Sequence, residues 1–102
     1  MNDLQSKIAE YRRGWIRKGQ YVEPNLTDAL DFMVAEVAEA IDKRLRLSNY
    51  VRNNDEGCPT KEDIAIEVFD AIMMGCVALD LLGFDLDEVA DKKLKIMDDK
   101  RK

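Results

Sequence analysis

The fold class is decided by residues 26–45, which read LTDALDFMVAEVAEAIDKRL. Apolar side chains recur there every three or four residues, which is the spacing of one face of an α-helix. The members of this stripe are Leu26, Leu30, Met33, Val34, Val37, Ile41 and Leu45. Pro24 or Asn25 stands where such a helix begins, since both residue types favour helix starts. The stretch therefore predicts a long amphipathic helix that begins near residue 25.

The same spacing recurs before this helix. Asn2 or Asp3 is placed to cap a first helix, which we expect to end near Gly19. Its stripe consists of Leu4, Ile8, Tyr11 and Trp15.

Two further helices are predicted after it. Thr60 with Asp63 three residues later has the pattern of a capping box, and the helix that follows should end at Gly83. Its repeating positions are Ile64, Val68, Ile72, Gly75 and Leu79. Asp85 with Glu88 repeats the starting pattern and predicts a last helix that runs into a charged end at 98–102.

Residues 48–59 are polar, contain Asn, Asp and Gly, and lack periodicity, so they predict a loop. Alternating strand patterns are absent from the sequence. The expected fold is all-α and four-helix bundle-like. The third helix is apolar on nearly every side over residues 71–82, which is more than a short bundle can shield. We therefore expect oligomerisation to complete the bundle, in a homodimer or homotetramer.

Composition narrows the range of functions. A chain of 102 residues forms one domain, and its net charge of −5 disfavours binding to nucleic acid. Histidine is absent, so acid–base or metal chemistry would depend on carboxylates, Lys, Tyr or water. Cys58 and Cys76 form no CxxC motif, so we expect both to be reduced thiols. The first twenty residues are rich in charge, which is not typical of a signal peptide. The longest uncharged apolar run is too short for a membrane span. We expect a cytoplasmic protein without a membrane partner.

Two acidic pairs are the most informative residues for chemistry. Glu36 with Glu39, and Glu67 with Asp70, are each spaced i,i+3. This spacing places two carboxylates on one face of a helix, about 4.5 Å apart along its axis. Acids on a solvated helix face are usually interleaved with Lys or Arg. Of these four, only Glu39 has a cation three or four residues away, which is Lys43.

Uncompensated carboxylates of this kind are explained either as ordinary solvated acids or as ligands of an external cation. A divalent ion that bridges the two helices would reverse their repulsion. Oxygen-only ligands select Mg²⁺, Mn²⁺ or Ca²⁺ over zinc, and Mg²⁺ held by a few carboxylates normally also takes substrate phosphate.

The arrangement resembles a known family. Residues 36–39 (EVAE) and 67–70 (EVFD) are followed by an apolar helix, a GFDL turn at 83–86 and a Lys-rich last helix. This order is similar to that of the MazG-like, all-α nucleoside triphosphate pyrophosphohydrolases, whose pattern is EExxE, a spacer and ExxD. The resemblance spans about residues 26–95, and it implies that residues 1–102 form a single MazG-like helical domain. The chain departs from the family at Ala35, where the first Glu of the motif usually stands, and at Met97, near where an Asn is common.

The resemblance implies hydrolysis of a (d)NTP to (d)NMP and pyrophosphate. Mg²⁺, with Mn²⁺ able to substitute, would be held by Glu36, Glu39, Glu67 and Asp70. The metals would neutralise phosphate oxygens and activate a water molecule. A carboxylate of the first pair, Glu36 or Glu39, would then accept the proton of that water, so these two residues are the expected catalytic ones.

Other residues are weaker predictions for substrate binding. Lys43, Lys92 and Lys93 could contact phosphates, although charged helix ends are usually solvated. Trp15 could stack on a nucleobase with Tyr11, although their place in the first stripe favours core packing.

Two alternative functions remain. Phosphoribosyl-ATP pyrophosphohydrolases are related enzymes whose second motif continues ADLLYH, whereas this chain reads FDAIMM over residues 69–74. A non-catalytic helical interaction module, binding a partner through the Met-rich third helix, belongs to a different class. Magnesium-dependent pyrophosphate release would separate catalysis from the interaction module.

Overall fold

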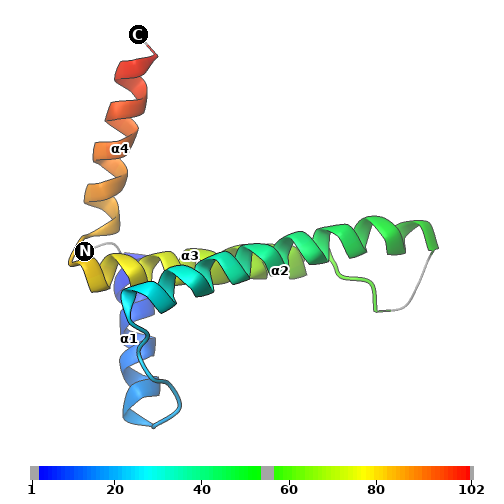
Figure 1. Cartoon of the computed structure of the whole chain (residues 1–102), viewed down its shortest axis with the longest axis horizontal. Coiled ribbons are helices and arrows are strands. Elements are labelled where there is room, and N and C mark those ends of the chain that lie inside the picture. The colour runs from blue at the N-terminus through cyan, green and yellow to red at the C-terminus, as the bar shows by residue number, and fades with distance from the viewer. Residues whose placement is uncertain (1–2, 54–56, 102) are drawn as a thin grey trace.

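The structure is a computed structural model that describes residues 3–53 and 57–101, and it is built from four helices (Figure 1). These are α1 (Asp3–Arg17), α2 (Leu26–Asn53), α3 (Lys61–Leu82) and α4 (Leu86–Lys100). The described residues contain no β-strand. The all-α prediction with four helices is therefore confirmed. No helix among them is both long enough and apolar enough to cross a membrane.

The helix starts follow the local sequence signals. Asn25 Oδ1 accepts a hydrogen bond from the backbone N–H of Asp28 at 2.8 Å. Thr60 and Asp63 form the predicted capping box, in which Thr60 Oγ1 accepts from the Asp63 N–H at 3.1 Å and Asp63 Oδ2 accepts from the Thr60 N–H at 2.8 Å. Asp85 caps α4 by accepting from the Asp87 N–H. Donors at the starts of α2, α3 and α4 that lack a partner within the helix are thereby satisfied.

The helix ends were predicted less well. Gly83 ends α3 with a φ of 81°, a left-handed conformation that glycine adopts without strain. The predicted loop at 48–59, however, is wrong over its first half, because α2 continues to Asn53. Residues 45–53 contain neither Gly nor Pro, so polar composition alone does not end the helix. Residues 54–56 of that predicted loop lie outside the described residues. The last helix runs into the charged end at 98–102, as predicted, and reaches Lys100.

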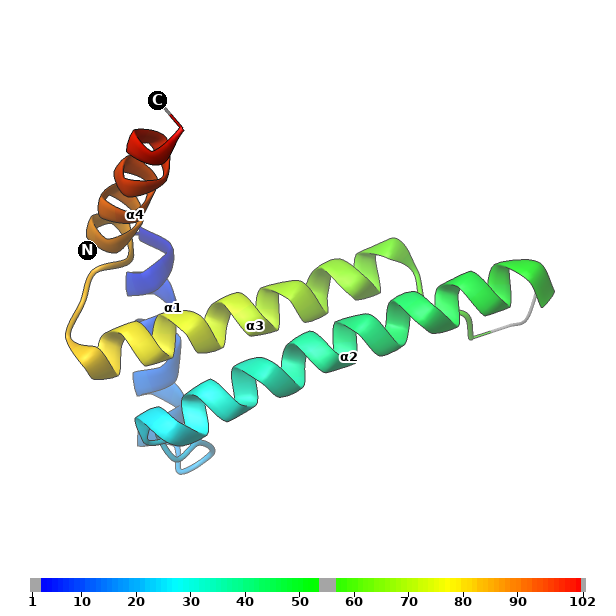
Figure 2. The same cartoon turned by 45° about the horizontal axis from the view of Figure 1, so that its top comes forward.

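The long helices α2 and α3 lie side by side and run in opposite directions (Figures 1 and 2). Their shared core consists of Ala29, Met74, Val77 and Ala78, packed against Leu26, Met33 and Met73. Helix α1 crosses α3 near the C-terminal end of α3. Helix α4 leads away from the α2–α3 pair and has no buried residue. Cys76 is buried, as expected of a small core residue, and Cys58 is half-buried.

The face of α2 that turns toward α3 differs from its most apolar face. The less exposed positions of α2 are Leu26, Ala29, Met33, Glu36, Ala40, Lys43 and Leu47. The rest of the predicted core stripe is exposed, with Val34 at 69%, Val37 at 45% and Ile41 at 52%. Glu36 lies on the side of α2 that meets α3.

Candidate metal centre

Three of the four predicted acidic residues meet between α2 and α3. Glu36 from α2 and Glu67 and Asp70 from α3 each offer a carboxylate oxygen within 4.8 Å of the others. The register explains this meeting, because Glu36 follows Met33 by one turn and Asp70 precedes Met74 by one turn, and both methionines pack in the interhelical core. Helix α2 therefore covers the acidic face of α3. We call Glu36, Glu67 and Asp70 the acidic cluster.

Glu67 is the most buried member of the acidic cluster, at 8% exposure. Its Oε1 accepts a hydrogen bond from Lys43 Nζ at 2.5 Å. Its Oε2 is buried and receives no hydrogen bond. A buried carboxylate oxygen without a donor is costly, and such groups in folded proteins usually have a partner. The unpaired Oε2 and the two neighbouring carboxylates form a donor set that could hold a cation.

The pKa values of the acidic cluster reflect burial and crowding. Burial raises the pKa of the Glu36 carboxyl, and the charges of Glu39, Asp70 and Glu67 raise it further. Burial, followed by the charge of Glu67, also raises the pKa of Asp70. The hydrogen bond from Lys43 lowers the pKa of Glu67. Two of the three carboxyls are thus held in a setting that disfavours their charged form, which a bound cation would reverse.

Glu39, the fourth predicted ligand, is exposed and lies outside this group of three. It is nevertheless near, because it contributes to the pKa shifts of both Glu36 and Glu67. Lys43 contacts Glu67 on the neighbouring helix, although the sequence spacing favoured a pair with Glu39. Asp63 serves as the cap of α3, as the sequence indicated, and this role lowers its pKa.

The predicted substrate-binding residues lie in two other places. Lys92 and Lys93 are exposed on α4, which leads away from the α2–α3 pair (Figure 1). Trp15 is half-buried, and its ring lies 6.0 Å from that of Tyr11 and 5.9 Å from that of Tyr21. It lines a mainly apolar cavity of about 290 Å³. The other lining residues are Leu4, Lys7, Ile8, Tyr11, Phe69 and Met73.

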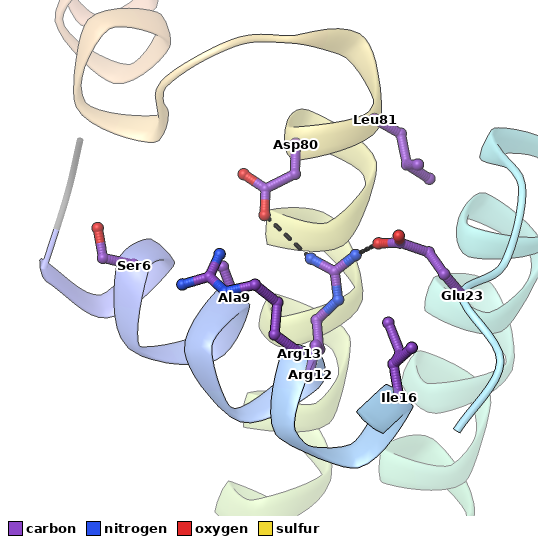
Figure 3. Close-up of a pocket in the computed structure, with 8 residues that line it drawn as sticks. All are labelled: Ser6, Ala9, Arg12, Arg13, Ile16, Glu23, Asp80 and Leu81. Carbon is purple, nitrogen blue, oxygen red and sulfur yellow. Dashed lines mark hydrogen bonds and ion pairs between the residues drawn. The ribbon is translucent and has the colours of Figure 1, made fainter. Parts of the chain in front are cut away.

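A second polar site was largely missed from the sequence. Arg12 is buried on α1, and its guanidinium lies between the carboxylates of Asp80 and Glu23 (Figure 3). Gln5, which is fully buried, donates to Asp80 Oδ1 at 2.7 Å and to the Phe84 carbonyl at 3.0 Å. Asp80 within an apolar run was the one visible signal, because a lone acid there needs polar partners.

This network forms one side of an open cavity of about 460 Å³. Charges of both signs line the cavity, since its lining includes Arg12, Arg13, Asp80 and Glu23. The Gln5 carboxamide also accepts a hydrogen bond from the N–H of Leu86, the first residue of α4, at 2.7 Å. The network thus joins α1 to the end of α3 and the start of α4, and its contacts are those of a structural anchor.

Comparison of the chain with protein-family models, with curated proteins and with solved structures finds no match. The resemblance to the MazG-like enzymes therefore rests on the two acidic pairs and the helix order.

Proposed function

We propose that the protein is a Mg²⁺-dependent nucleoside triphosphate pyrophosphohydrolase, which converts a (d)NTP to a (d)NMP and pyrophosphate. The observation that carries the proposal is the meeting of Glu36, Glu67 and Asp70 between two helices, with Oε2 of Glu67 buried and unpaired. The free cysteines Cys58 and Cys76 favour a reducing compartment, so a cytoplasmic location belongs to the same proposal.

The acidic cluster suits a hard divalent ion. All of its donors are carboxylate oxygens, which Mg²⁺ and Mn²⁺ prefer. Oxygens around Mg²⁺ lie about 2.9 Å apart when adjacent and about 4.1 Å apart when opposite, so the three oxygens, which fall within 4.8 Å of one another, would draw closer around the ion. A few carboxylates leave the remaining coordination positions of Mg²⁺ to water and phosphate, which suits a triphosphate substrate.

The acidic side chains have different roles in this reaction. Glu67 and Asp70 hold the ion from α3, and Glu36 and Glu39 complete the set from α2. Bound Mg²⁺ supplies neutralisation of phosphate charge and activation of water. Glu36 or Glu39 accepts the proton of the attacking water.

Substrate contacts complete the proposal. The cavity beside Trp15 could take the nucleobase, because it is mainly apolar and three aromatic rings, those of Tyr11, Trp15 and Phe69, border it. Lys92 and Lys93 on α4 are free to reach phosphate if a second subunit places α4 near the acidic cluster. Lys43 already lies beside Glu67.

The test is product analysis across the common ribo- and deoxynucleoside triphosphates with Mg²⁺. Equal amounts of monophosphate and pyrophosphate are expected, with release stopped by excess chelator. Diphosphate with orthophosphate, or no release from any triphosphate, would contradict the proposal.

Assembly into a homodimer or homotetramer is part of the same proposal, and the surface supports it. A compact monomer of this mass exposes about 5,900 Å², whereas this chain exposes 7758 Å². Its radius of gyration is 17.0 Å, against about 13 Å for a compact domain of this length. The excess of about 1,900 Å² is in the range that each subunit of a permanent dimer buries. A second copy packed on Val34, Val37 and Ile41 would cover part of it.

Light scattering at micromolar concentration tests this assembly. A mass of two or four chains is expected, and Val37→Asp should lower it, because a charge would be buried in the interface. A monomeric parent would contradict the assembly. It would also favour the alternative of a non-catalytic helical interaction module that binds a partner through the Met-rich third helix.

A further inference from the structure

The ammonium group of Lys43 lies on the acidic cluster. Lys43 follows Glu39 by one helical turn, yet its side chain reaches across to Glu67 on α3, with 2.5 Å between Nζ and Oε1. Of the ion pairs between described residues, this is the one that involves a member of the cluster. The hydrogen bond to Glu67, together with the charges of Asp63 and Glu39, raises the pKa of Lys43.

This single positive charge leaves the carboxylates unbalanced. Glu36, Glu39, Glu67 and Asp70 carry four negative charges when ionised, and Oε2 of Glu67 receives no donor even with Lys43 in place. The ammonium also sits on the same carboxylate that a divalent ion would use. Two cations at one carboxylate repel each other, so the ion and the ammonium compete.

The Lys43 side chain is able to leave. It is 27% exposed and has a flexible stem, whereas Glu67 is held between the helices at 10% side-chain exposure. Its departure would break the ion pair to Glu67. The less exposed apolar residues next to it on the α3-facing side of α2, Ala40 and Leu47, would stay in place.

We propose that Lys43 is the built-in counterion of the acidic cluster and that a divalent cation displaces it from Glu67. This inference rests on the proposed metal centre and adds an exchange to it. In the absence of the ion, the ammonium limits repulsion between α2 and α3. When the ion binds, Lys43 is released toward solvent at the edge of the site.

Two measurements on the full chain test the exchange, with Mn²⁺ or Mg²⁺ alone as the probe. The first is the rate at which acetic anhydride modifies each lysine, read by mass spectrometry at constant pH. Saturating Mg²⁺ should speed modification of Lys43 severalfold, and exposed Lys18 should be unaffected. The second is the Mn²⁺ dissociation constant, measured by calorimetry. The Lys43→Met variant should bind Mn²⁺ about tenfold more tightly than the parent, because it lacks one positive charge near the ion. The matched variant Lys18→Met should bind as the parent does.

The outcomes separate the exchange from the metal centre. Unchanged Lys43 modification, or equal or weaker Mn²⁺ binding by Lys43→Met, overturns the exchange while the parent still binds the ion. If neither the parent nor Lys43→Met binds Mn²⁺, or if Glu67→Gln binds it as well as the parent, the metal centre and the exchange are both wrong. The modification measurement needs no variant, so misfolding of Lys43→Met cannot hide the result.

Discussion

Asp80 and Arg12 form an ion pair between α3 and α1, with 3.0 Å between Arg12 Nη1 and Asp80 Oδ2. The Arg12 side chain is 5% exposed and that of Asp80 is 18% exposed. Removal of one partner would leave the other charge poorly solvated and unpaired. The pair therefore fixes α1 across the end of α3, which is also where Gln5 reaches the start of α4.

Arg12→Met should destabilise the protein by about 3 kcal/mol, because Asp80 loses its cation in a partly buried site. Urea unfolding followed by circular dichroism measures this loss. Arg13→Met is the matched control, because Arg13 is the adjacent arginine and is exposed, and its effect should stay within about 0.5 kcal/mol. Equal effects of the two changes would show that the buried pair does not anchor α1.

Thr60→Ala should cost about 1 kcal/mol of stability, because it removes the side-chain acceptor for the Asp63 N–H. The same unfolding measurement applies. Thr27→Ala, at an exposed position in the first turn of α2, is the control and should be nearly neutral. Equal losses would contradict the capping role.

Glu36→Gln should stabilise the metal-free protein at neutral pH. The pKa of Glu36 is raised in the folded chain, so the folded form holds its proton more tightly than the unfolded form. As pH rises through the unfolded and then the folded pKa, the parent loses stability, and the Gln variant does not. The variant should therefore melt higher than the parent at pH 7.5 with chelator present. This advantage should shrink as pH falls below the raised pKa, and a difference independent of pH would contradict the assignment.

Mg²⁺ should raise the melting temperature of the parent by about 5 °C or more at tenfold excess over its dissociation constant. The double variant Glu67→Gln with Asp70→Asn should lose this rise, because it removes two ligand charges. Glu62→Gln, an exposed acid on the same helix, should keep it. A rise in the double variant equal to that of the parent would place metal binding elsewhere.

Local signals made most of the fold predictable. Thr60 with Asp63 and the left-handed Gly83 mark α3 within a few residues, so both its ends follow from the sequence. The end of α2 did not follow, because residues 48–53 are polar but include no residue that breaks a helix. A polar stretch without a helix-breaking residue such as Gly or Pro therefore does not by itself end a helix.

The site was predictable as a set of residues and less so as an arrangement. The i,i+3 spacing singled out four acids, and the structure brings three of them together, Glu36, Glu67 and Asp70. The predicted apolar stripe of α2, which includes Val37, is not the face that packs against α3. The interhelical face instead has the small residues Ala29 and Ala40 on either side of Glu36. Close helix packing favours small side chains, and hydrophobicity alone does not weigh that.

Long-range polar partners were the least predictable part. Lys43 had a local partner at the favourable spacing, yet its ammonium lies on Glu67 of the other helix. Gln5 and Asp80 are 75 residues apart in sequence and hydrogen-bonded in space. Such pairs depend on how the helices cross, which a single sequence does not encode in any local pattern.

The most direct test of the central claim is the rate of pyrophosphate release by Glu36→Gln, with Mg²⁺ and the best substrate of the parent. The account predicts a loss of about two orders of magnitude or more, as for removal of a general base, with helicity unchanged by circular dichroism. Glu62→Gln should release pyrophosphate at the parent rate. Full activity in a folded Glu36→Gln protein would contradict the catalytic role of the acidic cluster.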